Sequence, residues 1–273
     1  MTKIERLRGI LSEIGPCAVA YSGGADSAFL ADVAHDVLGY DGTIAVTAVS
    51  ESLAPNERRD AASLAQSRGW RHTEIVTREI ERAEYRANEP DRCYHCKTEL
   101  FEMLDGLAES LGVNAVLVGT NTDDIGDFRP GQRAARERGV RAPLLEADLS
   151  KDEIRALSRE RGLPTWDKPA SACLASRIAY GVEVTAERLD RVARAEDVLR
   201  SLGVREMRVR DHGDLARIEV PSAWIARLAS GEVRERLADG LRALGFAYVT
   251  LDLEGFVSGS MNRTLLRIGP VRE

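Results

Sequence analysis

The sequence contains few aromatic residues, few cysteines and no long apolar run. Aromatic side chains make up 5% of its 273 residues, and it has 4 cysteines. No apolar stretch approaches the roughly 20 residues of a membrane-spanning helix, so no membrane partner is expected. Lysine and arginine number 38 against 44 aspartates and glutamates, and the net charge of −6 argues against a nucleic-acid surface. Residues 1–7 are typical of an amphipathic helix rather than a signal peptide, which predicts a cytoplasmic protein.

A glycine-rich turn near the N-terminus joins an apolar run to a helical stretch. The run 17–21 predicts a strand, and 28–33 predicts a helix. Glycines let the backbone expose its N–H groups, and a helix N-terminus adds partial positive charge, so this segment predicts an anion-binding cradle. It lacks the Gly-Lys-Ser/Thr ending of a Walker A loop. The turn consists of Ser22, Gly23, Gly24, Ala25, Asp26 and Ser27.

This turn resembles the pyrophosphate loop of the ATP pyrophosphatases, which cleave ATP to AMP and pyrophosphate. Gly23, Gly24 and the hydroxyls of Ser22 and Ser27 are therefore expected to bind the phosphates and then the pyrophosphate. Asp26 repels phosphate, so it is expected to position a Mg²⁺ that bridges to it. The alternative is an ordinary Gly-Gly turn capped by serine and aspartate.

Apolar strands alternate with helical stretches from residue 17 to about residue 149. Further strands are expected at 43–49, 73–77 and 115–118, with helices over 56–69 and 97–112. This alternation predicts an α/β, Rossmann-like parallel sheet with helices on both faces, whose ligands bind beyond the carboxyl ends of the strands. Candidate nucleotide or Mg²⁺ contacts follow the last of these strands, with an Asx-type turn as the alternative. They are Thr120, Asn121, Asp123 and Asp124.

A second, smaller region is expected after an irregular segment that contains two prolines. Before that segment, 150–162 predicts a helix that Ser150 caps, and after it 185–202 predicts another that Thr185 caps. Strand-like runs alternate with helical stretches from there on, which predicts a small α+β domain. The expected strands are 205–210, 215–220 and 248–253, and the expected helices are 223–228 and 232–244.

The cysteines suggest a metal or redox site. Cys93 and Cys96 form a C-x-x-C, which suits a redox pair, half of a zinc site or part of an iron–sulfur site. Cys17 lies in an apolar strand and is expected to be a core residue. Cys173 stands in a polar segment, so Cys93, Cys96 and Cys173 form a candidate triad. Three thiolates leave one iron of a [4Fe–4S] cluster open to an exogenous group, and His95 is the alternative fourth ligand.

Four segments together resemble the LarE family of ATP-dependent sulfur transferases, and the resemblance covers most of the chain. The last segment, with Cys173 between a Lys-Pro pair and Leu-x-Ser-Arg, is the most discriminating. The resemblance implies an ATP pyrophosphatase domain at 1–165 and a C-terminal α+β domain for substrate binding and homo-oligomerisation at 166–273. The four segments are 22–27, 88–97, 119–124 with Arg129, Pro130 and Gly131, and 168–177.

The resemblance also implies a reaction. ATP adenylates a carboxylate of pyridinium-3,5-biscarboxylic acid mononucleotide, and sulfur then displaces AMP to leave a thiocarboxylate for the nickel-pincer nucleotide of lactate racemase. Activation is needed because a free carboxylate is inert to sulfur attack, whereas the mixed anhydride carries AMP as a leaving group. The sulfur donor, sulfide or another compound, does not follow from the sequence.

Members of this family obtain the sulfur in two ways. In one type a cysteine matching Cys173 gives up its own sulfur and becomes dehydroalanine. In the other type three cysteines hold a [4Fe–4S] cluster that carries the sulfur. With Cys93, Cys96 and Cys173 this sequence resembles the cluster type. A sacrificial Cys173 is the alternative, and a zinc-bound or disulfide form of the C-x-x-C is the third option.

Other residues receive roles by resemblance. Lys97 is a candidate phosphate or adenylate clamp, with an exposed surface lysine as the alternative. Ser176 and Arg177 are expected to contact substrate phosphate or carboxylate. Arg208 and Arg210 alternate along one strand, so they share a face and suit bidentate anion binding, unless that face is merely solvated. The residues expected near the substrate or a metal are Glu196 and Glu219.

Three other functions compete with this interpretation. A tRNA thiolase with the same loop would need a basic RNA-binding surface, which the net charge of −6 disfavours. A non-catalytic iron–sulfur or zinc scaffold would not need the glycine-rich loop. An amide-forming synthetase would ordinarily need a glutaminase partner or domain. The expected partners are therefore a small mononucleotide and a sulfur donor, with no nucleic acid.

Overall fold

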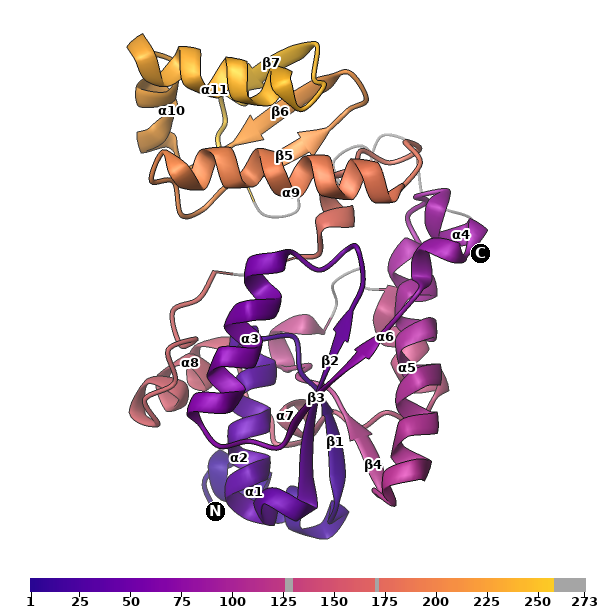
Figure 1. Cartoon of the computed structure of the whole chain (residues 1–273). Coiled ribbons are helices and arrows are strands. Elements are labelled where there is room, and N and C mark those ends of the chain that lie inside the picture. The colour runs from indigo at the N-terminus through magenta and orange to yellow at the C-terminus, as the bar shows by residue number, and fades with distance from the viewer. Residues whose placement is uncertain (126–129, 170–171, 258–273) are drawn as a thin grey trace. The chain divides into compact units, whose positions relative to one another are not determined.

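The protein consists of two compact units (Figure 1), which a computed structural model describes at residues 1–125, 130–169 and 172–257. The N-terminal unit comprises Met1–Glu79 and Cys93–Ser171. The C-terminal unit comprises Ile80–Arg92 and Ala172–Glu273. The segment Ile80–Arg92 thus groups with residues that lie far along the chain. The roles expected of 1–165 and 166–273 stay predictions.

The N-terminal unit is built on a four-stranded parallel sheet with the order β3-β2-β1-β4. This confirms the predicted α/β class with a parallel sheet. Cys17 of β1 aligns with Thr43 of β2 on one side and with Ala115 of β4 on the other. The order reverses at β1, which places the topological switch point between β1 and β4. The strands are β1 (Cys17–Ala20), β2 (Thr43–Val49), β3 (His72–Val76) and β4 (Ala115–Leu117).

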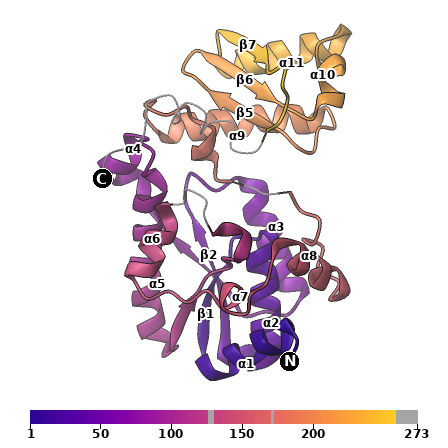
Figure 2. The same cartoon turned by 180° about the vertical axis from the view of Figure 1, so that it is seen from behind.

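Helices cover both faces of this sheet (Figures 1 and 2). The helix α5 begins at Arg92, five residues before the predicted start, because 91–96 contain no helix breaker and Pro90 stands just ahead of the first turn. The helices are α1 (Lys3–Ile14), α2 (Ala25–Gly42), α3 (Pro55–Ser67), α5 (Arg92–Leu111), α6 (Pro130–Glu137), α7 (Pro143–Glu146) and α8 (Lys151–Glu160), with the short 3₁₀ turn η2 (Thr122–Asp124). Another 3₁₀ turn, η1 (Glu79–Glu81), spans the boundary between the two units.

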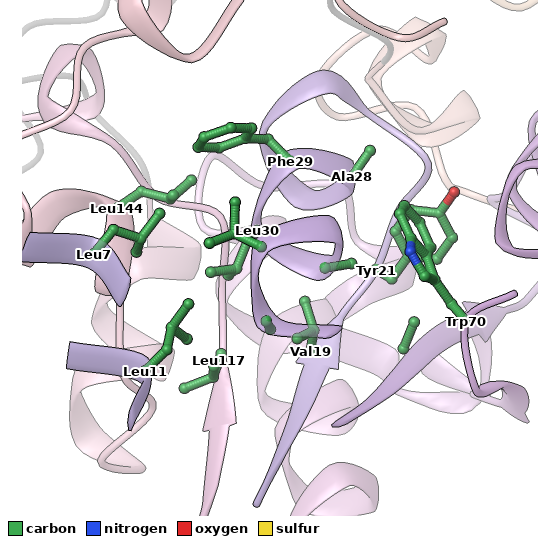
Figure 3. Packing of buried hydrophobic residues seen from close by; sticks show 14 of the residues in the cluster. Leu7, Leu11, Val19, Tyr21, Ala28, Phe29, Leu30, Trp70, Leu117 and Leu144 are labelled. Atoms are coloured by element: carbon green, nitrogen blue, oxygen red, sulfur yellow. The ribbon is translucent and has the colours of Figure 1, made fainter. Parts of the chain in front are cut away.

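Side chains of the central strands alternate between two apolar clusters. Val19 of β1 packs in the cluster of α1, α2 and α3, whereas its neighbour Ala18 packs against α5 and α6 on the other face. Figure 3 shows the first cluster, where Leu11 of α1 and Leu117 of β4 are fully buried. This double-sided burial explains why the strands are near-continuous apolar runs rather than alternating ones.

The C-terminal unit is an α+β structure around a three-stranded sheet, β5-β6-β7. β5 and β6 are antiparallel, and β6 and β7 are parallel. The hydroxyl of Thr185 caps α9, as the sequence predicts. Within the described ranges, no helix is long and apolar enough to cross a bilayer. The elements are α4 (Ala83–Arg86), η3 (Leu174–Arg177), α9 (Ala186–Ser201), β5 (Arg208–Asp211), β6 (Leu215–Glu219), α10 (Ser222–Leu228), α11 (Gly231–Ala243) and β7 (Tyr248–Leu251).

Candidate functional site

The glycine-rich turn links the carboxyl end of β1 to the N-terminus of α2. Gly23 has a φ of +73°, and a Cβ atom there would lie 2.9 Å from the Cβ of Ala61 on α3. Both the backbone conformation and the close approach therefore require glycine. Gly24 is the N-cap of α2, so the turn leads directly into the positive end of the helix dipole.

The two serines tie this turn together. The backbone N–H of Ser22 donates to the Oγ of Ser27 at 3.2 Å, and the two hydroxyl oxygens lie 3.1 Å apart. The Ser27 hydroxyl also donates to the carbonyl of Gly24 at 3.2 Å. Ser27 is buried and Ser22 is exposed. The turn is thus preorganised by its own hydroxyls, and their binding of phosphate stays a prediction.

Asp26 lies in the first turn of α2, and its two carboxylate oxygens have different surroundings. Its Oδ2 forms an ion pair with the ammonium of Lys151, the first residue of α8. Its Oδ1 is buried and has no hydrogen-bond partner in the described part of the chain. A buried carboxylate oxygen without a donor suits a hard cation, so Asp26 fits the predicted Mg²⁺. The pairing of Lys151 with Asp26 was not predicted from the sequence.

The loop after β4 reaches the same helix end. A Cβ on Gly119 would lie 2.9 Å from the backbone nitrogen of Ser27, so this glycine allows the two loops to touch. The Asn121 side chain accepts from the backbone N–H of Asp123 at 3.0 Å, and the Asp124 carboxylate accepts from that of Asn121 at 3.0 Å. These bonds form an Asx-type turn, which was the sequence-based alternative to a binding role for these residues. Thr120 is half-buried beside them.

The two loops flank the switch point between β1 and β4, where ligands of open α/β sheets bind. The first residue of α8 contacts both loops: the Lys151 side chain binds Asp26, and the Lys151 backbone N–H donates to Asp123 Oδ2 at 2.5 Å. The start of α8 is itself fixed by a capping box between Ser150 and Glu153, as predicted. Roles of the loop residues in nucleotide binding stay predictions.

Lys168 provides another contact to the glycine-rich turn, one that the sequence did not predict. Its ammonium donates to the carbonyl oxygen of Gly23 at 3.0 Å and pairs with Glu57 Oε2 of α3 at 2.6 Å. Lys168 opens the discriminating segment 168–177, which was the only signal that could have drawn attention to it. Ala170 and Ser171 of that segment, like Arg129, lie outside the described residues.

The C-x-x-C lies in the first two turns of α5. Cys93 is exposed and Cys96 is half-buried. Lys97 is exposed on the same helix, which packs on the sheet face opposite to α2. A Cβ on Gly131 would lie 2.8 Å from Lys97 Cγ, so α6 approaches this turn closely. The role of Lys97 as a clamp stays a prediction.

The cysteines differ sharply in environment. Cys17 is fully buried, and this burial raises its thiol pKa to about 12, which confirms it as a core residue. Cys173 is exposed, and no cysteine of the described ranges is in a disulfide. Among these ranges, no group of three or more His, Cys, Asp or Glu side chains is placed to hold a metal. The cluster and zinc interpretations stay predictions.

In the C-terminal unit, the carbonyl of Cys173 is the centre of a tight turn. It accepts from the backbone N–H of Ser176 at 3.0 Å, from the Ser176 hydroxyl at 2.7 Å and from Arg177 Nη1 at 3.0 Å. Arg177 is 3% exposed, and its Nε pairs with Glu196 at 2.9 Å. The turn thus fixes the backbone of Cys173 while leaving the residue exposed.

Next to this turn, buried charges gather around β5. Arg210 Nη2 pairs with Glu219 Oε2 at 2.6 Å, and its Nη1 donates to the carbonyl of Ser176 at 3.0 Å. Burial lowers the pKa of Arg208 to about 10, and the nearby Arg177 and Arg210 guanidiniums add to this. The alternative of a solvated strand face is wrong, because Arg210 is 6% exposed. The residues that the structure brings together are Ser176, Arg177, Glu196, Arg208, Arg210 and Glu219.

Two residues of the segment 80–92 bind carbonyl oxygens of residues 175–182, in and just after the Cys173 turn. Asn88 is fully buried at a φ of +57°, and its amide donates to the carbonyl oxygens of Ala179 and Val182 at 2.8 Å each. Arg92 donates to the carbonyl of Ala175 at 2.9 Å and also binds Asn88. Both residues belong to the segment 88–97 that carries the resemblance, which gave them no role.

Similarity to a named protein decides the family. A protein of Lactiplantibacillus plantarum, pyridinium-3,5-bisthiocarboxylic acid mononucleotide synthase, is 41% identical over 266 residues, which are 97% of this chain and 96% of that protein. This chain belongs to the LarE family. No family model matches it.

Two uncharacterized proteins extend the comparison for this LarE-family chain. One from Synechocystis sp. is 48% identical over 266 residues, which are 97% of this chain and 99% of that protein. One from Methanocaldococcus jannaschii is 30% identical over 167 residues, which are 61% of this chain and 64% of that protein. The family assignment confirms the predicted resemblance. Whether this chain is a cluster-type or a sacrificial LarE protein stays a prediction.

Proposed function

We propose that this protein is an ATP-dependent sulfur transferase that converts a carboxylate of pyridinium-3,5-biscarboxylic acid mononucleotide to a thiocarboxylate. The product serves the nickel-pincer nucleotide cofactor of lactate racemase. The observation that carries the proposal is 41% identity, over 97% of this chain, to a protein named pyridinium-3,5-bisthiocarboxylic acid mononucleotide synthase. The glycine-rich turn at the switch point and at the N-terminus of α2 supports the proposal, because ATP phosphates suit such a position.

The first half-reaction activates the substrate. A carboxylate oxygen of the mononucleotide attacks the α-phosphorus of ATP, the bond from that phosphorus to the bridging oxygen breaks, and pyrophosphate leaves. The Gly23-Gly24 turn and the N-terminus of α2 bind the departing pyrophosphate through backbone N–H groups and the helix dipole. Asp26 would hold Mg²⁺ through its unpartnered oxygen, and the ion would neutralise phosphate charge when bound.

The second half-reaction replaces AMP by sulfur. A sulfur nucleophile attacks the acyl carbon of the adenylate, and the bond from that carbon to the AMP oxygen breaks. The arginines around β5 concentrate positive charge next to the Cys173 turn, which suits a substrate with a phosphate and two carboxylates. Ser176, Arg177, Arg208 and Arg210 are the proposed substrate contacts, with Glu196 and Glu219 orienting two of the arginines.

For the sulfur source we assign a [4Fe–4S] cluster to Cys93, Cys96 and Cys173. Thiolates are the ligands of such clusters, and a cluster with three protein ligands leaves one iron open to hold a sulfide. Cys93 and Cys96 stand three residues apart on α5 and so share one helix face. Sacrificial loss of sulfur from Cys173 is the second candidate, which the exposure of that cysteine favours.

The test is anaerobic purification followed by iron and sulfide analysis and assay with ATP, Mg²⁺ and the mononucleotide. The expected results are pyrophosphate release and a product whose mass shows oxygen replaced by sulfur. Without pyrophosphate release that depends on the mononucleotide, the proposed function is wrong. Cys93→Ala should lose iron and sulfur transfer but keep pyrophosphate release. Iron-free protein whose Cys173 becomes dehydroalanine after turnover would instead establish the sacrificial route.

The remaining expectations are part of the same proposal. The protein is proposed to be cytoplasmic and homo-oligomeric, with sulfide or another small donor supplying sulfur. Size-exclusion chromatography coupled to light scattering measures the oligomeric state directly. Omission of sulfide from a multiple-turnover assay tests whether sulfide itself is the donor.

A further inference from the structure

We propose that Lys168 is a positioning residue that sets the orientation of the Gly23–Gly24 peptide in the pyrophosphate-binding turn. Its ammonium binds the carbonyl oxygen of Gly23 and thereby directs the N–H of Gly24 towards the anion. This inference rests on the proposed function, because it needs the turn to bind pyrophosphate. It adds a residue whose contact with the turn spans 145 positions of sequence.

The contacts hold Lys168 firmly at both of its ends. At the tip, the ammonium lies 3.0 Å from Gly23 O and 2.6 Å from Glu57 Oε2, and the Lys168 and Glu57 side chains are only 18% and 16% exposed. At the backbone, the Lys168 N–H donates to Thr165 O at 3.1 Å, and Lys168 O accepts from Arg155 Nη2 of α8 at 3.1 Å. The ammonium is therefore a fixed charge rather than a mobile surface group.

Because of the geometry of the peptide unit, the contact of Lys168 with the Gly23 oxygen also orients the N–H of Gly24. The Gly23 carbonyl and the Gly24 N–H belong to one planar trans peptide, so they point in opposite directions. A cation on the oxygen fixes the plane and polarises the peptide, which makes the N–H a stronger donor. Glycine offers little resistance to rotation of this plane, so the turn depends on an external hold.

The other contacts of the turn described here do not bind the Gly23 carbonyl oxygen. Ser27 Oγ binds the carbonyl of Gly24 and the N–H of Ser22, which fixes the Gly24–Ala25 and Tyr21–Ser22 peptides but not the Gly23–Gly24 peptide. Ala61 limits the position of Gly23 by contact but provides no donor there. Lys168 is the residue that binds the Gly23 oxygen itself, at 3.0 Å.

A structural strut between the segment 163–169 and α3 is the competing explanation. A strut would change the stability of the protein when removed, and it would weaken all ligands of the N-terminal unit alike. A positioning role acts on one end of the nucleotide site. It therefore weakens pyrophosphate binding and leaves AMP binding unchanged.

The experiment measures the binding of Mg²⁺-pyrophosphate and of AMP separately, by calorimetry, in wild type, Lys168→Met and Lys168→Arg. The matched control is Lys3→Met, because Lys3 also pairs with a glutamate, Glu153, at 2.9 Å but does so away from the turn. A lost charge-assisted hydrogen bond predicts at least a tenfold fall in pyrophosphate affinity for Lys168→Met, with AMP affinity unchanged. Lys168→Arg should show a smaller fall, since the guanidinium keeps the charge but moves the donors.

The outcomes separate the inference from the proposed function. If wild type binds neither ligand, the proposed function fails and takes the inference with it. If wild type binds both and the two Lys168 variants match Lys3→Met, the inference alone is overturned. Equal losses of pyrophosphate and AMP affinity would establish the strut instead. Should Lys168→Met not fold, Lys168→Arg decides by the same comparison.

Discussion

Gly23 is the position at which the pyrophosphate-binding turn is most sensitive to a single methyl group. Its φ of +73° lies in the left-handed region, and a Cβ would lie 2.9 Å from the Cβ of Ala61. The left-handed backbone costs a non-glycine residue about 1–2 kcal/mol. Carbon atoms prefer a separation of about 3.5–4.0 Å, so the contact adds an overpacking cost of about 1–3 kcal/mol. Gly23→Ala should therefore lower the free energy of unfolding by about 2–5 kcal/mol.

Urea unfolding followed by tryptophan fluorescence measures this loss. With a slope of about 2 kcal/mol per molar urea, the midpoint should fall by about 1–2.5 M. The matched control is Gly112→Ala, because Gly112, just after the end of α5, has a φ of +64° but no described atom within 4 Å of its added Cβ. It should lose only the backbone contribution of about 1–2 kcal/mol.

A double-mutant cycle isolates the contact with Ala61. Ala61→Gly removes the methyl group that the new Cβ would meet, and by itself it should cost about 1 kcal/mol of helix propensity. The double variant Gly23→Ala/Ala61→Gly should then be more stable than the sum of the single losses predicts. Equal losses for Gly23→Ala and Gly112→Ala, together with an additive cycle, would refute the reasoning.

Three further predictions concern single groups. Asp26→Asn should abolish pyrophosphate release from ATP with an unchanged circular dichroism spectrum, and retained release would contradict the assigned role. Hydrogen bonds from the Ser150 N–H and then from Lys3 lower the pKa of Glu153 from the usual 4.5 to about 2. The ionised carboxylate therefore contributes its full stabilisation above pH 4.5 and loses it as the pH falls to 2. Between these pH values the Tm of Glu153→Gln should fall less than the Tm of the wild type. Iodoacetamide at about pH 8 should alkylate Cys173 of the iron-free protein and spare Cys17, which mass mapping of native protein checks.

The sequence predicted the elements of the fold well wherever local pattern decides them. The strand Thr43–Val49 has the predicted bounds, because a β-branched apolar run stands between clear breaks. The caps at Ser150 and Thr185 were also predicted, since a hydroxyl ahead of a helical stretch satisfies a local N–H group. The helix start at Arg92 was missed because the cysteine motif obscured an otherwise helical stretch.

Contacts between distant parts of the chain could not be predicted in this way. Lys151 and Lys168 reach the glycine-rich turn from 125 and 145 positions away, and neither periodicity nor composition marks them among the other lysines. Glu196 and Glu219 look like exposed charges on a helix and a strand. They are 2% and 0% exposed because each faces an arginine from another element, a pairing that only the fold creates.

The interleaved path of the chain constrains how the protein can be dissected. A fragment that starts at Ala172 would lack Asn88, whose buried amide binds the carbonyl oxygens of Ala179 and Val182. The same amide also donates to the carbonyl of Ile178 in a buried bond at 3.3 Å, and a buried carbonyl left without a donor costs about 1–3 kcal/mol, so simple truncation should yield an unstable product. Independent expression of the C-terminal unit therefore calls for a spliced gene in which the codons for 80–92 precede those for 172 onward through a flexible linker.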